Sequence, residues 1–251
     1  MLQRCKRLIP VILYGTFYMT CFSWLEKFPR KYHIINSTLD YKIPFCEYFI
    51  IPYFLWFLYI AGTVLFFIFF NEDKIEYQNL LINLGIGMTL FLIVSYVYPN
   101  GLSLRPTKFA RDNIFTDLVG FLYTIDTPTN VLPSIHVYNS VAAFCALNNC
   151  KKLQKHRGIR VSAFILTVLI ILSTMFLKQH SICDVATGIT FAVASYIMIY
   201  KVYARGNAKE NAKEKHRVIY AKNRRGYREI DSSIDSLISD TLPQKRLYQT
   251  E

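Results

Sequence analysis

The sequence predicts an all-α protein, a polytopic membrane helix bundle of six transmembrane helices. Of its 251 residues, 53% are hydrophobic and only 18% are charged. Uninterrupted apolar runs recur at close to the ~20 residues that a helix needs to cross a bilayer. The alternative, a large soluble helical protein, would show shorter apolar stretches or amphipathic periodicity instead.

The six predicted spans, in chain order, are residues 8–25, 46–70, 79–98, 131–148, 159–177 and 181–200. The first follows a basic segment, but no small-x-small cleavage site precedes Phe22 and Trp24, so we expect a retained span rather than a signal peptide. The fourth and sixth spans are the least apolar because they carry polar groups. Such spans typically face the interior of a bundle or an aqueous cleft.

The formal net charge is +12, which by itself would suggest a nucleic-acid partner. However, twelve of the 29 Lys and Arg residues follow Tyr200, and five lie between Lys151 and Arg160. With both termini inside, the cytoplasmic segments hold 21 basic residues and the outer segments hold eight. An excess of this kind marks the cytoplasmic side of a membrane protein. We therefore predict a multi-pass cell-membrane protein with both termini cytoplasmic and no nucleic-acid partner.

Two polar stretches begin the fourth and sixth spans, at residues 133–136 (Pro-Ser-Ile-His) and 178–184 (Lys-Gln-His-Ser-Ile-Cys-Asp). Ionisable groups cost about 2.5–3.5 kcal/mol at a bilayer centre, so such a cluster indicates a functional site. The i, i+4 spacing of His180 and Asp184 places both on one helical face. The carboxylate can hold one imidazole nitrogen and leave the other free as nucleophile or base. Ser134 can cap its helix, whose free N–H groups favour an anion.

A third polar patch, Arg105-Pro106, lies in the predicted outer loop 99–130, with Lys108 and Arg111 nearby. A guanidinium is the natural bidentate partner of phosphate oxygens. Taken singly, the patches have ordinary explanations: a solvated basic loop, a helix cap and a buried His–Asp hydrogen bond. Together they supply a nucleophile, an acid and a cationic cradle, all predicted on the outer membrane face.

This arrangement resembles the type 2 phosphatidic acid phosphatase superfamily, six-span lipid phosphatases and related phosphotransferases. The family pattern is Lys-x6-Arg-Pro, then Pro-Ser-Gly-His, then Ser-Arg-x5-His-x3-Asp. Here the blocks read Tyr98-x6-Arg105-Pro106, Pro133-Ser134-Ile135-His136 and Ser173-Thr174-x5-His180-x3-Asp184. The spacing of the third block matches throughout, and the resemblance covers about residues 46–200.

Three positions depart from the family pattern. Tyr98 replaces lysine, Ile135 replaces glycine and Thr174 replaces arginine. Two phosphate-binding cations are therefore missing from their usual places. With a bulky residue between Ser and His, the second block more closely resembles that of the branch that contains inositol phosphorylceramide synthases. Those enzymes transfer a phospho-headgroup between lipids.

The resemblance implies that His180 attacks phosphorus, that Asp184 orients it, and that His136 protonates the leaving alkoxide. The implied phosphate-binding residues are Arg105, Ser134, Ser173, Lys178 and Lys108, and Lys178 with Lys108 or Arg111 would supply the charge of the missing cations. This chemistry requires neither a metal ion nor a cofactor. The sequence also lacks a carboxylate-rich cluster of the kind that magnesium prefers.

We thus expect an integral membrane phosphatase that hydrolyses a lipid phosphate monoester or diphosphate through a phosphohistidine. Phosphatidic acid, phosphatidylglycerol phosphate and an isoprenoid diphosphate are the candidate substrates. The alternatives are an inositol phosphorylceramide synthase-like headgroup transferase, a non-catalytic membrane protein of the same fold, and a bundle ligating a metal or haem through His136 and His180.

The chain divides into a first span with its outer loop (1–45), a catalytic transmembrane core (46–200) and a basic cytoplasmic tail (201–251). The tail is polar, with repeated Lys-Glu spacing, and is predicted to be a solvated helix or disordered. A basic segment directly after a span favours contact with anionic lipid headgroups.

Overall fold

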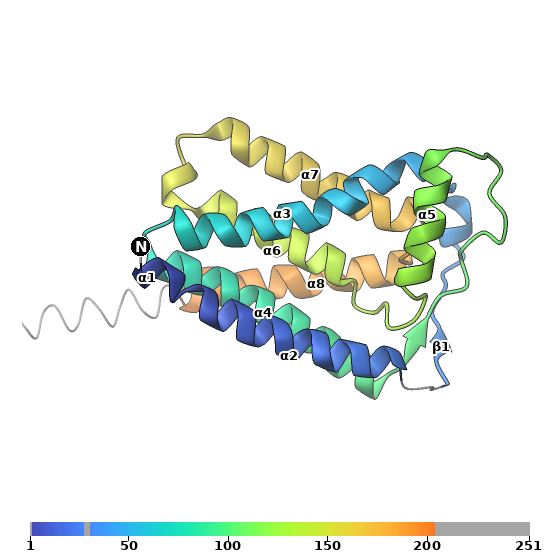
Figure 1. The fold of residues 1–251 in the computed structure, drawn as a ribbon, viewed down its shortest axis with the longest axis horizontal. Coiled ribbons are helices and arrows are strands. Elements are labelled where there is room, and N and C mark those ends of the chain that lie inside the picture. The colour runs from blue at the N-terminus through green and yellow to red at the C-terminus, as the bar shows by residue number, and fades with distance from the viewer. Residues whose placement is uncertain (1, 28–30, 204–251) are drawn as a thin grey trace, which may run out of the picture. The chain divides into compact units, whose positions relative to one another are not determined.

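The computed structural model describes residues 2–27 and 31–203, and these are mostly helical (Figure 1). The described residues up to Tyr200 form one compact unit. The predictions for the tail fall almost entirely outside the described residues. The long helices are α2 (Leu8–Lys27), α3 (Ile50–Phe69), α4 (Lys74–Val97), α5 (Ile114–Ile125), α6 (Ile135–Asn149), α7 (Arg157–Phe176) and α8 (Ile182–Tyr196).

Short elements join these helices. They are α1 (Leu2–Cys5), the 3-10 turns η1 (Asp40–Lys42), η2 (Glu47–Phe49) and η3 (Lys151–Leu153), the strands β1 (His33–Ile34) and β2 (Asn100–Gly101), and the π-helical η4 (Ile197–Tyr203). The two strands pair in parallel and bring the loop after α2 beside the loop after α4.

Five helices are long and apolar enough to cross a membrane: Leu8–Lys27, Glu47–Phe69, Lys74–Val97, Arg157–Phe176 and Ile182–Tyr200. They correspond to five of the six predicted spans. The remaining one, 131–148, is α6, which has 15 residues and begins at Ile135 because Ser134 is its N-cap. At 1.5 Å per residue it is about 22 Å long, shorter than the ~30 Å hydrocarbon core. Within the described residues, length and composition therefore support five spans.

The segment 99–130 is not simply a loop as the sequence predicts, because it contains α5. A capping box begins this helix: the Asn113 side chain accepts from the N–H groups of Phe115 and Thr116, and the Thr116 hydroxyl accepts from the Asn113 N–H. With 12 residues it is too short to span a membrane, so a search for long apolar runs misses it. It lies crosswise over one end of the bundle (Figure 1).

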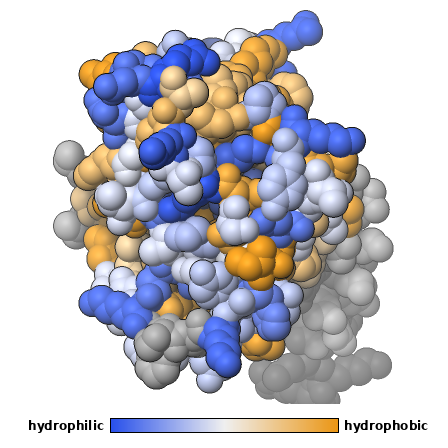
Figure 2. All heavy atoms as spheres, turned by 90° about the vertical axis from the view of Figure 1, so that its right-hand side faces the viewer, coloured by the Kyte–Doolittle hydropathy of each residue, from blue (hydrophilic) through white to orange (hydrophobic). Residues whose placement is uncertain are grey.

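All three polar patches of the sequence meet at that end. There α4 and α7 end and α3, α6 and α8 begin, on the right-hand side of Figure 1. Figure 2 views this end directly and shows mainly hydrophilic side chains over its centre. The helix directions therefore bring residues more than 70 positions apart in the sequence to one face of the bundle.

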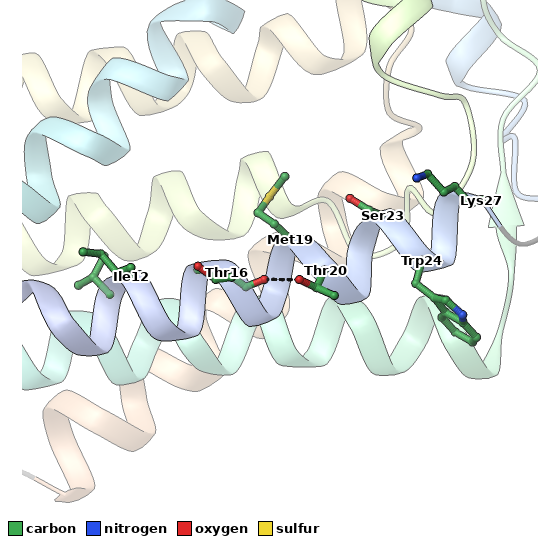
Figure 3. A pocket seen from close by; sticks show the side chains of 9 residues that line it. Ile12, Thr16, Met19, Thr20, Ser23, Trp24 and Lys27 are labelled. Carbon is green, nitrogen blue, oxygen red and sulfur yellow. Dashed lines mark hydrogen bonds between the residues drawn. The ribbon is translucent and has the colours of Figure 1, made fainter.

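Helix α2 packs on α4 through Tyr18 and Leu25, which contact Phe91 and Leu92. Beside it runs an open hollow of about 820 Å³ (Figure 3). Its lining within the described part of the chain comes from α2: Val11, Ile12, Gly15, Thr16, Met19, Thr20, Ser23, Trp24 and Lys27. The Thr20 hydroxyl is turned back to the Thr16 carbonyl at 2.8 Å. Lys27 is the only titratable group among these nine residues, so they contain no acid–base pair.

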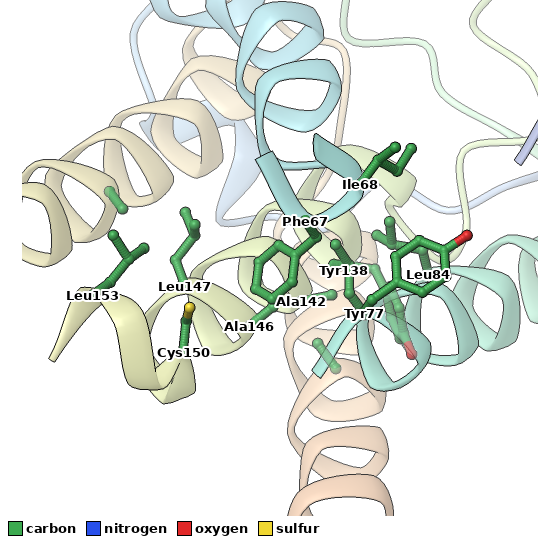
Figure 4. Packing of buried hydrophobic residues seen from close by; sticks show 13 residues of the cluster. Phe67, Ile68, Tyr77, Leu84, Tyr138, Ala142, Ala146, Leu147, Cys150 and Leu153 are labelled. Atoms are coloured by element: carbon green, nitrogen blue, oxygen red, sulfur yellow. The ribbon is translucent and has the colours of Figure 1, made fainter. Parts of the chain in front are cut away.

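Helix α6 is the centre of the bundle and contacts α3, α4, α7 and α8. Small side chains allow this close packing: Ala142 and Ala146 of α6 share a buried cluster with Ala163 of α7 and Ala192 of α8 (Figure 4). Small residues at helix interfaces are typical of membrane bundles, where backbones approach closely and dispersion contacts replace a hydrophobic driving force.

Polar groups also connect the helices inside this bundle. The Tyr138 hydroxyl lies 2.9 Å from Asn83 Oδ1, and the Ser195 hydroxyl lies 2.7 Å from the same oxygen. By contrast, large apolar side chains are exposed outside, such as Leu58 (70%) and Ile12 (60%). A polar interior with an apolar exterior is the arrangement that a lipid environment favours, because buried polar groups find partners only within the protein.

Gly87 of α4 provides the space for the Tyr138 ring, and this gives a test of the packing. A Cβ at position 87 would lie 2.1 Å from Tyr138 Cε1, whereas a Cβ at position 85 meets nothing within 4 Å. We expect Gly87→Ala to lower the free energy of unfolding by about 1–3 kcal/mol through overpacking. Gly85→Ala on the same helix is the matched control and should unfold no more easily than the parent. Equal melting temperatures of the two variants in detergent would contradict this packing.

Candidate active site

His136 and His180 lie together at the polar end of the bundle. His136 is in the first turn of α6, and His180 lies in the turn between α7 and α8. Their ring centroids are 5.6 Å apart, with the planes at 60°. Both side chains are at most 9% exposed. Two imidazoles this close can act on the same bound group.

His180 is oriented by Asp184. Its Nδ1 lies 3.0 Å from Asp184 Oδ2, and the same oxygen accepts the Ser181 N–H at 2.9 Å. Because a carboxylate only accepts, Nδ1 carries the proton and the lone pair of Nε2 is free. Asp184 thus closes the capping box of α8 and fixes the imidazole at the same time.

His136 lies against aromatic rings of α3. Its centroid is 4.4 Å from that of Trp56 and 4.7 Å from that of Tyr53. Its Nδ1 is buried and has no hydrogen-bond partner among the described residues, and the same holds for Trp56 Nε1. Since the great majority of buried polar groups are paired, these two atoms are candidates for ligand contact.

A cavity of about 260 Å³ opens beside the two histidines, and we call it the histidine cavity. Its polar wall comprises His136, His180, Gln179, Asp126, Thr127, Thr129 and Asn130. Its other walls are aromatic and aliphatic: Tyr18, Met19, Phe22, Tyr53, Phe54, Trp56, Phe57, Phe91, Leu122, Ile125, Val131 and Ile135. The cavity therefore joins a polar end, which contains the two imidazoles, to an apolar lining.

Ser134 lies next to the histidine cavity without lining it. It is fully buried, and its hydroxyl accepts the Val137 N–H at 3.4 Å as the N-cap of α6. Its own N–H donates to the Asp184 carbonyl at 3.3 Å. Ser134 thus joins the start of α6 to the start of α8. The sequence predicted it as a cap, which is present, and the resemblance implied a phosphate ligand, whereas Ser134 is not among the residues that line the cavity.

Arg105 does not line the histidine cavity itself but contacts two residues that do, Asp126 and Gln179. Its guanidinium donates to the carbonyls of Tyr123 (3.2 Å) and Asp126 (2.7 Å) and to Gln179 Oε1. It also lies 4.5 Å from the centre of the Tyr123 ring. Burial lowers the pKa of Arg105, and the nearby Asp126 carboxylate acts in the opposite direction. The guanidinium remains charged because arginine is not deprotonated in proteins.

The structure does not bring Lys178, Ser173 or Lys108 to the histidine cavity. The Lys178 ammonium donates to the carbonyls of Asp40 (2.7 Å) and Ile43. Burial lowers its pKa, and the charge of Asp40 partly opposes this. The Ser173 hydroxyl is buried and donates to the Ile170 carbonyl at 2.7 Å. Lys108 is exposed.

Arg111, considered as a further source of charge, also lies elsewhere. It is paired with Glu47 at 3.4 Å and sits over the ring of Tyr48. Tyr98, at the position of the family lysine, is 41% exposed and stacks on His33. Of the described residues that line the histidine cavity, none is lysine or arginine.

A backbone turn explains why Lys178 and His180 point in different directions. Lys178 has φ 55°, a left-handed conformation that commonly ends helices. The N–H groups of Gln179 and His180 then both donate to the Thr174 carbonyl, at 2.9 and 3.0 Å. This turn directs Gln179 and His180 into the cavity, whereas Lys178 reaches the loop before α3.

Sequence reasoning missed Asp40, which is 2% exposed. Its Oδ2 accepts from the Ser181 hydroxyl and the Ser37 N–H, both at 2.6 Å, and its Oδ1 accepts the Ile182 N–H at 2.8 Å. No local sequence pattern predicts the hydrogen bond between Asp40 and Ser181, because the two residues are 141 positions apart. Asp40 therefore caps α8 from outside the helix.

The chain matches no protein-family model, no curated protein and no solved structure. The site must therefore be judged by its own geometry. In residues 2–27 and 31–203, no group of three or more His, Cys, Asp or Glu side chains is arranged to hold a metal ion. The two histidines are placed for acid–base or nucleophilic chemistry with Asp184.

Asp40→Ala tests the external cap. The substitution leaves the Ser181 hydroxyl and the Ile182 and Ser37 N–H groups without their acceptor, and each unsatisfied buried group costs about 1–3 kcal/mol. We expect the free energy of unfolding in detergent to fall by roughly 2–4 kcal/mol, after relaxation of the loop. Asp112→Ala, at an exposed aspartate, should change it by less than about 0.5 kcal/mol. Equal effects would mean that Asp40 does not hold α8.

Proposed function

We propose that this membrane protein hydrolyses a lipid phosphate monoester or diphosphate through a phosphohistidine intermediate. The observation that carries the proposal is the pair of histidines 5.6 Å apart, one of them held by a buried carboxylate. Such a pair can divide one displacement into two steps, with a nucleophile and a separate acid. The resemblance of the motif spacing to the type 2 phosphatidic acid phosphatase superfamily supports the same assignment.

In the first step His180 Nε2 attacks phosphorus. An N–P bond forms, the bond from phosphorus to the leaving lipid oxygen breaks, and His136 gives that oxygen a proton. Asp184 accepts from Nδ1 and stabilises the charge that develops on the ring. In the second step His136 takes a proton from water and the water oxygen attacks phosphorus. The N–P bond breaks, inorganic phosphate is released, and His180 returns to its original state.

Under this proposal α6 is a sixth, short span. It carries His136 and contacts four neighbouring helices, which supports a place in the membrane core although it is shorter than the bilayer. The loop 131–134 before it would complete the crossing. Six spans place both termini on one side, and the excess of Lys and Arg makes that side cytoplasmic, with the histidine cavity on the outer face.

A phospho-headgroup transferase is the second candidate, and the charge of the cavity favours it. None of the described lining residues is a lysine or arginine, and Arg105 acts through Gln179. A phosphodiester lipid carries one negative charge and needs fewer cations than a monoester dianion. The lining threonines and asparagine (Thr127, Thr129, Asn130) suit the hydroxyls of a polyol headgroup.

His180→Ala should abolish phosphate release from a panel of lipid phosphates, because the nucleophile is gone. His156→Ala is the matched control, since His156 is exposed and lies at the start of α7, at the opposite end of the bundle. His136→Ala should slow turnover by about 10²–10⁴-fold. It should still form a phosphohistidine from a substrate with a good leaving group. The assay contains a chelator, so activity lost by chelation alone would indicate a metal site instead.

The two candidate activities are separated by supplying an acceptor. With a radiolabelled phosphodiester lipid, a transferase should give a labelled product only when a lipid or polyol hydroxyl acceptor is added. A hydrolase should release label into water at the same rate with and without acceptor. If the parent does neither on monoester, diphosphate and diester panels, and its melting temperature does not respond to phosphate, the chain is a non-catalytic member of the fold.

A further inference from the structure

The wall of the histidine cavity contains a buried amide with unused donors. Gln179 is 3% exposed, lines the cavity and directly precedes His180. Its Oε1 accepts from the Arg105 guanidinium. Its Nε2 is buried and has no hydrogen-bond partner among the described residues.

The orientation of this amide is determined by its partner. Arginine has only donors, so the oxygen of Gln179 must face Arg105 and the NH2 group must face away from it. Leaving such a donor group buried and unpaired costs about 1–3 kcal/mol. The charged Arg105 guanidinium therefore fixes the Gln179 side chain at the edge of the cavity before any ligand binds. The uncharged NH2 group of Gln179 then offers two N–H donors.

Neighbouring side-chain donors at the end of α7 and in the turn that carries His180 are already used. The Lys178 ammonium is bound to two loop carbonyls, and the Thr174 hydroxyl donates to the Ile171 carbonyl at 2.7 Å. The Ser173 hydroxyl is likewise bound within its own helix. In the turn that carries His180, Gln179 thus has the side-chain donors left for an oxyanion, and it is adjacent to the nucleophile.

We propose that Gln179, held by Arg105, binds a non-bridging oxygen of the phosphoryl group that His180 attacks. This rests on the proposed function and names the group that takes over from the arginine of the family pattern, which here is Thr174. Preorganised donors aimed at developing negative charge are a major source of catalysis, and they need no proton transfer. Arg105 acts by polarising the amide and fixing its orientation.

Gln179→Glu is the sharpest variant. It keeps an oxygen for Arg105 but replaces both donors with a second carboxylate oxygen. We expect kcat/KM to fall by about 10²–10³-fold, as on loss of an oxyanion contact. We also expect the rise in melting temperature caused by inorganic phosphate to disappear. Gln78→Ala, at an exposed glutamine of α4, is the control and should behave as the parent.

His180→Ala distinguishes this inference from the proposed function, because it should lose turnover yet keep the phosphate-dependent rise in melting temperature. If Gln179→Glu retains both that rise and a rate within threefold of the parent, Gln179 is not a phosphate ligand, while the proposed function stands. If the parent itself shows neither turnover nor a response to phosphate, both proposals fail. Should Gln179→Glu unfold more easily without phosphate, Gln179→Met, similar in volume and uncharged, is measured against the same criteria.

Discussion

The buried residue Asp184 connects the helix packing to the candidate chemistry. Its Oδ2 accepts the Ser181 N–H that begins α8 and also holds Nδ1 of His180. Its carbonyl accepts the N–H of Ser134, the cap of α6. The two elements that carry the histidines therefore start from hydrogen bonds to one residue. A shift of α8 by one residue would separate these contacts, so the distance between His136 and His180 depends on where this helix begins.

The surroundings of this residue explain how so many polar groups are buried at one end of an apolar bundle. Asp40 accepts the Ile182 N–H at the start of α8. Arg105 donates to three oxygens, namely the carbonyls of Tyr123 and Asp126 and Oε1 of Gln179. Hydrogen bonds are stronger electrostatically where water is scarce, and unpaired groups are correspondingly costly. Among the described residues with a buried unpaired side-chain atom, His136, Trp56 and Gln179 line the histidine cavity, so their unpaired atoms are informative about a ligand. Others, such as Asn79 and Asn139, lie away from the cavity lining.

Local spacing predicted the parts of the site that local structure controls. The His180–Asp184 pair and the Ser134 cap were predicted from local spacing, and both are present. His180, however, lies in the turn before α8 and not on one face of that helix with Asp184. The direction of Lys178 could not be predicted, because it depends on a left-handed backbone and on carbonyls 135–138 positions away. Five spans were evident as long apolar runs. Helices α5 and α6 are harder to identify from the sequence. Helix α5 is short and amphipathic, and α6 carries several polar residues among its apolar ones.

Under the proposed function, hydrolysis and headgroup transfer would share the same first half, a phosphohistidine at His180, so the acceptor alone would distinguish them. The acceptor is decided by what can approach phosphorus on the His136 side. There the rings of Tyr53 and Trp56 cover the imidazole and limit its access to water. A neutral donor such as Gln179 is also better suited to the single negative charge of a phosphodiester than to the two charges of a phosphomonoester dianion. These two features speak for the second candidate of the proposal, in which a phosphodiester enters and the hydroxyl of another lipid takes up the phospho-headgroup. The motif spacing speaks for the first. A monoester could react by the same route only if Arg105 were released from its carbonyl partners to face the phosphate directly.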